Sequence, residues 1–139
     1  MSAETMLTAE DLELLARRLH GYLTVADGPV PPQPRPVWFE AAPDGTVQLF
    51  TPSGSPKLRR LRRDPRASLV VAAPADEREH WVSVTGRVTL ESDGARELAT
   101  RLAHRYWDVD ERADDLTGLL AEEQIRIVLH PERVQRFAF

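Results

Sequence analysis

Short β-rich runs joined by tight turns constrain the fold of this chain more than any other feature of its sequence. Five runs precede residue 92, and one further strand and a short β-like tail follow near the end. The runs lie at 22–27, 35–41, 46–51, 66–74, 80–91, 125–130 and 131–139. None of the connections among the first five holds a helix long enough to cross over between parallel strands. The sequence therefore predicts a mainly β fold, a six-stranded antiparallel barrel with flanking helices.

Two glycine signals refine this sheet. Asp44-Gly45, inside "APDG", separates the runs at 35–41 and 46–51, and an Asp-Gly turn of this kind predicts that the two pair as a hairpin. Gly86 lies in the middle of the run "HWVSVTGRVTLE". A glycine inside a strand commonly marks a bulge, so we expect one there.

Helical patterns flank the predicted sheet. Thr8 followed by Asp11 indicates an N-cap with an acidic first turn, and the apolar residues at 12, 15, 16 and 19 share one helical face. From residue 93, Leu98, Leu102 and Tyr106 recur every four residues, which predicts an amphipathic helix. We expect Trp107, at the end of that helix, to be a core residue. A further helical stretch follows at 112–123.

Composition indicates an ordinary globular protein. Its 139 residues fit a single domain, 1–139, with 42% hydrophobic and 29% charged residues. No apolar run approaches the roughly 20 residues of a membrane helix, and the start "MSAETMLTAEDLELL" has acids where a signal peptide needs basic and apolar regions. We therefore expect a cytoplasmic protein with no membrane partner. The net charge of -4 also argues against nucleic acid as the main partner.

The sequence gives little support for a metal site or for a catalytic nucleophile. The chain has no cysteine, which excludes disulfides, thiolate metal sites and thiol nucleophiles. The histidines at 20, 80, 104 and 130 show no paired ligand spacing, and we expect no metal site. No Ser-His-Asp arrangement or glycosidase-like carboxylate pair stands out, so the catalytic residues stay unknown.

The loop at 51–57, "TPSGSPK", is the strongest candidate for a binding site. It follows a strand and leads at once into the helical turn "KLRRLRR", where backbone N–H groups and the helix dipole favour an anion. Of the 18 basic side chains, 17 are arginine, and the single lysine, Lys57, lies here. Thr51, Ser53 and Ser55 can donate hydroxyl hydrogen bonds, and Lys57 supplies a compact positive charge. On this segment alone, an ordinary turn with a solvated lysine remains the alternative.

The run "KLRRLRR" admits other interpretations. Leu58 and Leu61 lie one helical turn apart, so the turn is expected to dock through them before Asp64-Pro65 ends it. Its arginines could form a nucleic-acid patch, but one basic turn in an acidic protein is more often a solvated face, and no row of exposed aromatics accompanies it.

Three segments together resemble the flavin-binding split-barrel family related to pyridoxamine 5'-phosphate oxidase. They are "RPVWFE", "LFTPSGSPKLRRLRRDPRASLVV" and "WVSVTGRVTL", in that order, and they are most similar to the short branch of FMN-dependent or coenzyme F420-dependent proteins. The resemblance implies a six-stranded antiparallel split β-barrel of the FMN-binding type. It also implies a homodimer with the cofactor at the subunit interface.

The resemblance further implies site residues by position. Arg35, Pro36, Val37 and Trp38 lie on the strand that runs beside the flavin ring and ribityl phosphate, Phe50 and Thr51 match the pair at the ring's polar edge, and Ser55 and Lys57 match the phosphate ligands. Trp81 falls where the vitamin oxidases keep a glutamine, and Pro56 where they keep an arginine. The arginine-rich tail of those oxidases is also missing, so we do not expect oxidation of pyridoxamine phosphate.

The leading hypothesis is an oxidoreductase that binds FMN or F420 through the Ser-x-Lys loop and exchanges hydride or electrons with a small organic substrate. The sequence does not distinguish the two cofactors. A non-catalytic protein that binds or senses a flavin, a deazaflavin or haem is the alternative, and a cofactor-free dimer is a third possibility.

Overall fold

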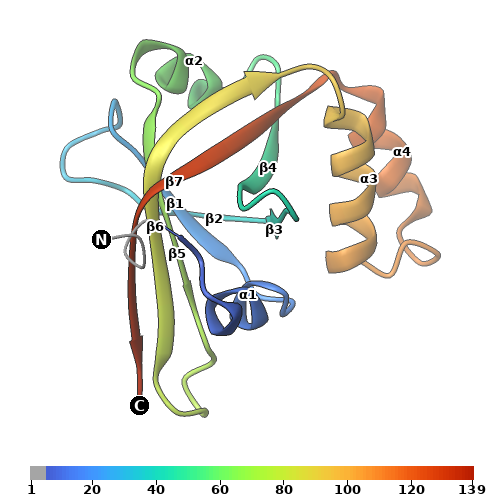
Figure 1. Ribbon diagram of the computed structural model, residues 1–139. Coiled ribbons are helices and arrows are strands. Elements are labelled where there is room, and N and C mark those ends of the chain that lie inside the picture. Colours follow the sequence, from blue (N-terminus) through green and yellow to red (C-terminus); the bar gives the residue numbers. More distant parts are fainter. Residues whose placement is uncertain (1–5) are drawn as a thin grey trace.

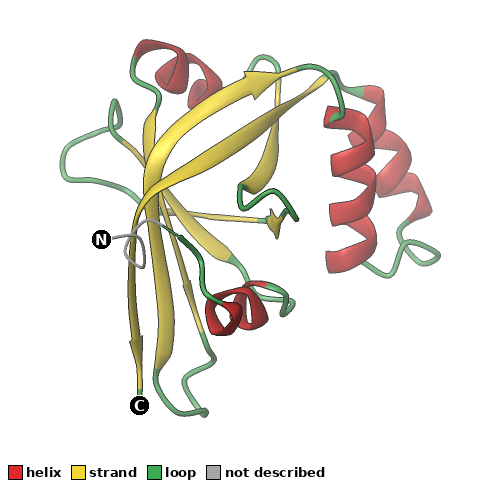
Figure 2. Cartoon of the chain, viewed as in Figure 1, coloured by secondary structure: helices red, strands yellow, loops and turns green. Residues whose placement is uncertain are grey.

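Seven strands and four helices make up the part of the chain that the computed structural model describes, residues 6–139. The strands are β1 (Gly21–Val25), β2 (Arg35–Val37), β3 (Glu40–Ala41), β4 (Val47–Pro52), β5 (Arg66–Ala72), β6 (His80–Glu91) and β7 (Gln124–Ala138). The helices are α1 (Ala9–Leu15), α2 (Pro56–Arg63), α3 (Ala95–Tyr106) and α4 (Ala113–Ala121). All strands belong to one sheet, and the helices lie outside it (Figure 2).

The order of the strands makes the sheet curl. The order is β2-β1-β5-β6-β7-β4-β3, and every pairing is antiparallel. The two edge strands, β2 and β3, follow each other in the chain with only Trp38 and Phe39 between them. Three peptide steps span at most about 11 Å, so the two edges must lie close together. The sheet is therefore a split barrel, and Figure 1 shows its strands wrapping around a common interior.

The predicted hairpin around Asp44-Gly45 forms only in part. Glu40 and Ala41 pair with β4, as expected, but Arg35–Val37 pairs with β1 instead. The run at 35–41 is thus divided between the two edges of the split barrel. This division raises the strand number from the predicted six to seven. The predicted strand at 125–130 and the tail after it are one continuous strand, β7.

The predicted bulge at Gly86 is confirmed. Thr85 pairs with Arg133 while Gly86 pairs with Pro131, so Glu132 is an extra residue in β7. A Cβ atom on Gly86 would lie 1.9 Å from the carbonyl oxygen of His130. Only glycine allows this close backbone approach. The bulge lets β6 and β7 bend together, and in Figure 1 they form the long curved ribbon of the barrel.

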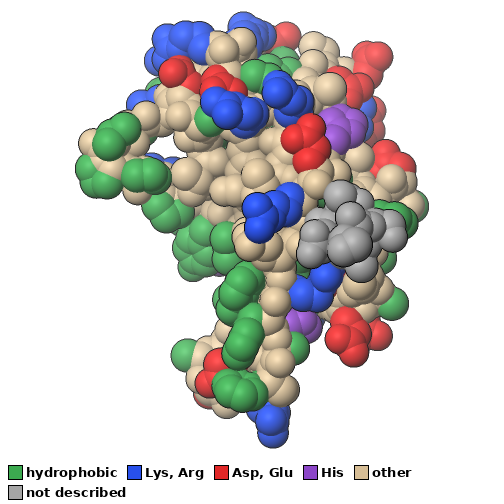
Figure 3. Space-filling view, turned by 60° about the vertical axis from the view of Figure 1, so that its left-hand side comes forward, with side chains coloured by type: hydrophobic (Ala, Val, Ile, Leu, Met, Phe, Trp, Pro, Cys, Tyr) green, Lys and Arg blue, Asp and Glu red, His purple; other side chains and the backbone are tan. Residues whose placement is uncertain are grey.

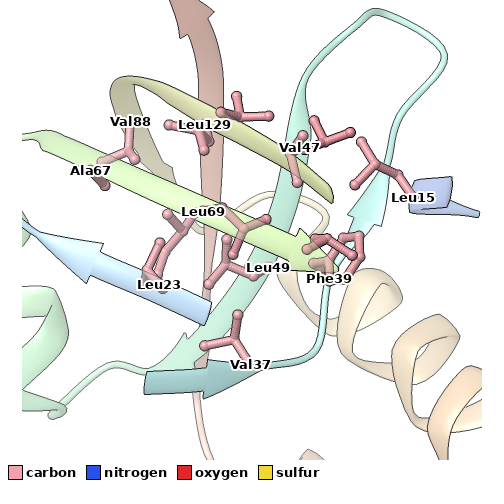
Figure 4. Close-up of a cluster of buried hydrophobic side chains, with 14 of the residues drawn as sticks. Leu15, Leu23, Val37, Phe39, Val47, Leu49, Ala67, Leu69, Val88 and Leu129 are labelled. Carbon is pink, nitrogen blue, oxygen red and sulfur yellow. The ribbon is translucent and has the colours of Figure 1, made fainter. Parts of the chain in front are cut away.

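The barrel interior holds the main hydrophobic core. Alternate residues of the strands point inward and are buried, as in the patterns of β5 and β6. Figure 4 shows Leu23, Leu49, Leu69 and Leu129 converging there from different strands, together with Phe39 from the junction between β2 and β3. Leu58 and Leu61 of α2 are 0% and 1% exposed, which confirms the predicted docking of this helical turn.

Helix α1 begins as predicted and buries only part of the expected face. The Thr8 side chain caps it and Asp11 completes a capping box. Leu12 is 39% exposed, whereas Leu14 and Leu15 are buried. The expected face is confirmed at Leu15, and Leu19 packs against the core from the segment beyond the helix end, but the expectation was wrong for Leu12 and Ala16, which are exposed. Among the described helices, none is both long and apolar enough to span a membrane.

Candidate functional site

Trp38 occupies the junction between the two edge strands and gathers aromatic rings from distant parts of the chain. Its ring stacks on Tyr106 of α3 with a centroid distance of 5.2 Å and an angle of 4°. It meets Trp107 edge-on at 4.8 Å and Phe50 of β4 at 6.1 Å. Together with Leu98 and Leu102, these rings pack α3 against the barrel. The junction is therefore a rigid aromatic cluster.

A pocket of about 340 Å³ opens beside this cluster. We call it the aromatic pocket, and its lining is His20, Pro36, Val37, Trp38, Phe50, Lys57, Trp107 and Leu119. Five of these residues come from the set that the sequence predicted. Flat apolar walls and a single lysine or arginine side chain suit a planar ring that carries an anionic group.

A smaller pocket of about 50 Å³ adjoins it, because Lys57 lines both. We call it the basic pocket, and its lining is Leu23, Thr24, Val25, Gly28, Pro29, Gln33, Arg35, Lys57 and Arg60. Its three cations have no carboxylate beside them in this lining. The guanidinium of Arg35 donates to the neutral side chain of Gln33 at 2.9 Å. The positive charge therefore remains available to an anion.

Lys57 is the centre of this arrangement. Its side chain is half-buried, and it has no hydrogen bond or ion pair with any residue in the range 6–139. Burial lowers the pKa of its ammonium below the ordinary 10.5, with no neighbouring acid to offset the cost. An ammonium that is partly removed from water and unpaired gains strongly from a bound anion.

Two of the three hydroxyl residues of the loop, Thr51 and Ser55, act through the start of α2, whereas Ser53 is exposed and lines neither pocket. Ser55 is the N-cap, and its Oγ accepts from the backbone N–H of Leu58 at 3.2 Å. The hydroxyl of Thr51 donates to the same Oγ at 2.7 Å. Ser55 thus retains its own O–H as a donor, while the hydroxyl hydrogen of Thr51 is already used. The pair fixes the helix start that carries Lys57.

Trp81 lies apart from the other predicted residues. It pairs with Ala72 of β5 and Phe137 of β7, and it lines neither the aromatic nor the basic pocket. Its ring is 37% exposed and stacks on Phe137. In the described part of a single subunit, Trp81 therefore does not join the site.

Several lining residues escaped the sequence prediction. Trp107 was expected in the core, but it caps α3 and lines the aromatic pocket, so that expectation was wrong. His20 and Leu119 arrive from loop and helix segments that no local pattern connects to the site. Arg60 had a usable signal, because it lies three residues after Lys57 on the same helix and so faces the same side.

The described part of the chain holds no cluster of metal-binding side chains. Within residues 6–139, no three histidine, aspartate or glutamate side chains gather as a metal site would require.

The fold places the protein among the split barrels, and a sequence match gives its family. The curled antiparallel sheet with outer helices is a split barrel, the architecture also seen in similar solved structures. Residues 7–135 match the family model of pyridoxamine 5'-phosphate oxidase. The match spans most of the chain, so the chain belongs to that family. No curated protein matches the sequence.

Three solved structures illustrate the likeness. The conserved hypothetical protein Rv2991 from Mycobacterium tuberculosis has a TM-score of 0.75 and 21% identity, covering 99% of this chain and 88% of that one. An F420 reductase has a TM-score of 0.67 and 23% identity, covering 88% and 94%. A FAD-binding protein from Mesorhizobium loti has a TM-score of 0.63 and 22% identity, covering 91% and 89%. At these identities the likeness establishes the fold.

Proposed function

We propose that this protein is an oxidoreductase that binds FMN or coenzyme F420 and exchanges hydride or electrons with a small organic substrate. The observation that carries the proposal is the unpaired, half-buried Lys57 where the aromatic and basic pockets meet. The family membership and a similar structure described as an F420 reductase support the same reading.

The residues present fit such a cofactor. Lys57, Arg35 and Arg60 supply three cations for a phosphate, and the hydroxyl of Ser55 lies at the start of the helix that carries two of them. Trp38, Phe50 and Trp107 offer flat walls for a conjugated ring. When bound, the cofactor ring would supply the electron chemistry, while these residues bind it, orient it and exclude water.

Cofactor titration of matched variants tests the proposal. We expect Lys57→Ala to weaken the binding of FMN or F420 by about tenfold to a hundredfold, since a charge-assisted hydrogen bond to a half-buried group is lost. Arg62→Ala is the control, because Arg62 is exposed on the same helix and lines neither pocket. The measurement is the dissociation constant from absorbance or fluorescence titration.

The comparison between the variants decides the outcome. A Lys57→Ala protein that is folded and binds the cofactor as tightly as Arg62→Ala would remove Lys57 from the site. Equal losses in both variants would indicate a general effect of charge and not a specific contact.

A non-catalytic flavin- or deazaflavin-binding protein is the second candidate. The observation that favours it is the scarcity of titratable groups in the aromatic pocket, whose described lining offers only His20 and Lys57. Stoichiometric cofactor binding without reduction or oxidation by any supplied hydride donor or acceptor would favour this function over the oxidoreductase.

We further propose that the protein is a homodimer, as the family resemblance implies. Support comes from three exposed rings at the far end of the β6–β7 ribbon, which we call the terminal aromatic patch: Trp81, Phe137 and Phe139. Hydrophobic side chains gather on the projecting lower part of the molecule in Figure 3. A second copy of the chain is the occupant we assign to this surface.

A further inference from the structure

A third pocket lies against the aromatic cluster, and only part of its lining belongs to the cofactor site proposed above. We call it the arginine pocket, with a volume of about 550 Å³ and the lining Arg18, His20, Trp38, Tyr106, Trp107 and Arg112. It shares His20, Trp38 and Trp107 with the aromatic pocket. The two pockets are therefore neighbours that meet at the same pair of tryptophans.

The charged side chains that line the arginine pocket are all positive. Among the described lining residues there is no aspartate or glutamate. Arg18 donates through Nη2 to the backbone carbonyl of Tyr106 at 3.0 Å, and it has no ion-pair partner within residues 6–139. This hydrogen bond orients the guanidinium without neutralising it. Arg18 thus keeps a full charge and further N–H donors for a ligand.

Arg112 contributes a second, weaker cation. Its guanidinium lies 4.1 Å from the centroid of the Trp107 ring, and its Nε donates to Asp115 at 2.8 Å. Asp115 offsets part of this charge, so Arg18 is the principal anchor. The stacked geometry still makes Arg112 and Trp107 a flat, positively charged wall.

The aromatic surfaces set the shape of the ligand. The Trp38 and Tyr106 rings stack on each other, parallel within 4°, and Trp107 meets Trp38 edge-on at 90°, so the rings that line the pocket form apolar walls held together by their own contacts. A planar conjugated body fits against such walls, and one anionic group beside it would reach Arg18. The preferred anion is a carboxylate, because it pairs with the guanidinium fork through two hydrogen bonds.

We propose that the arginine pocket binds a small aromatic or conjugated carboxylate, the class of the organic reactant that meets the cofactor across the Trp38–Trp107 pair. The assignment of this ligand as a reactant rests on the proposed function. The binding of the carboxylate itself does not, because it depends on Arg18 and the rings and not on Lys57.

Calorimetric titration with 2-naphthoate and its uncharged analogue 2-naphthamide tests the proposal. We expect naphthoate to bind more tightly than naphthamide. Arg18→Gln should weaken naphthoate about tenfold or more and leave naphthamide unchanged, because only the carboxylate loses a charged partner. Arg133→Gln is the control, since Arg133 is exposed on β7 and lines none of these pockets.

A second variant keeps the proposal testable if Arg18→Gln destabilises the fold. If Arg18→Gln lowers the melting temperature strongly, Arg112→Gln replaces it, with a smaller expected loss for naphthoate because Asp115 already shares that charge. Equal binding of both probes would overturn the proposal. Loss of naphthoate affinity in Arg133→Gln as large as in the pocket variants would also overturn it.

Two further arms separate this inference from the proposed function. Lys57→Ala should lose cofactor affinity and keep naphthoate affinity, and naphthoate should bind the cofactor-loaded protein. Displacement of the cofactor by naphthoate would overturn the inference, because the arginine pocket would then be part of the cofactor site. If wild-type protein binds naphthoate but neither cofactor, the proposed function fails while carboxylate binding stands.

Discussion

At the scale of single residues, Lys57 illustrates how a binding group can reduce stability. Burial lowers the pKa of its ammonium, which means that the positive charge lowers the free energy of unfolding. The unfolded chain holds this proton more tightly than the folded one. The cost is therefore fully present below the lowered pKa and disappears as the pH rises towards 10.5. A bound anion would offset it.

Replacement of Lys57 by an apolar side chain should separate stability from binding. Without a ligand, we expect Lys57→Met to raise the melting temperature at pH 7 by up to about 4 °C. The advantage should shrink as the pH rises from the lowered pKa towards 10.5, because the folded wild-type lysine then loses its proton. Calorimetry of this variant and of Arg62→Met, an exposed site on the same helix, measures the effect. A lower melting temperature for Lys57→Met alone would contradict the stated cost of burial.

At the scale of secondary-structure elements, the β6–β7 ribbon depends on one glycine. The backbone of Gly86 meets the carbonyl of His130 so closely that no Cβ fits between them. Gly118 in α4 is the opposite case, because a Cβ there would meet no described atom within 4 Å.

These two glycines give a matched pair of substitutions. Gly86→Ala should destabilise the fold by about 3 kcal/mol, since the ribbon must shift away from His130. Gly118→Ala should instead stabilise it by about 0.5–1 kcal/mol through the better helix propensity of alanine. Chemical denaturation measures both. Similar free energies of unfolding for the two variants would show that the bulge is not held by backbone contact.

A second inter-element link ties the N-terminal helix to the last strand. Asp11 is 1% exposed, and its carboxylate accepts from Arg136 Nη2 at 2.9 Å and Nε at 3.0 Å. Its Oδ2 also accepts from the backbone N–H of Thr8. Burial by itself would raise the pKa of Asp11, but the bonds from Arg136 and Thr8 outweigh it and hold the pKa below 3.8.

The link predicts a loss of stability in acid. Because the pKa of Asp11 is lower in the folded chain, its contribution is present above about pH 4 and is lost as the pH falls through the folded pKa. At pH 7, Asp11→Asn should cost about 2 kcal/mol, and the difference from wild type should shrink below pH 4. Urea unfolding across this pH range checks it, with exposed Glu13→Gln as the control. A difference that does not change with pH would contradict the role of the charge.

At the scale of the whole molecule, closure of the sheet creates the site. The two edge strands meet because only Trp38 and Phe39 separate them in the chain, and the pockets form where that junction faces α2 and α3. In the proposed dimer, two copies of the chain meet through the terminal aromatic patch at the far end of the β6–β7 ribbon.

The dimer leads to a prediction about mass in solution. Combined Trp81→Ser and Phe137→Ser substitution should shift the protein from dimer to monomer, because the patch loses its exposed rings. Val30→Ser is the control, since Val30 is 93% exposed and lies outside the patch. Sedimentation velocity measures the mass. A wild-type monomer at high micromolar concentration would contradict the assignment.

Local sequence signals made much of the fold predictable. The features that depend on how the barrel closes could not be predicted, because closure brings together residues far apart in the sequence. Gly86, Leu58 and Leu61 carried local signals that the structure confirms. The division of 35–41 between two sheet edges could not be predicted from the sequence, because it depends on how the barrel closes. For the same reason Trp107 was assigned to the core. The lining residues on β2, β4 and the junction between the edge strands were anticipated through the family resemblance, whereas His20, Trp107 and Leu119 come from segments that no local pattern connects to the site.

The most direct test of the central claim is equilibrium titration of the purified wild-type protein with FMN and, separately, with F420. We predict that at least one of them binds with a dissociation constant in the micromolar range or below, with its spectrum shifted by the aromatic walls. Failure of both to bind at micromolar concentration would contradict the account.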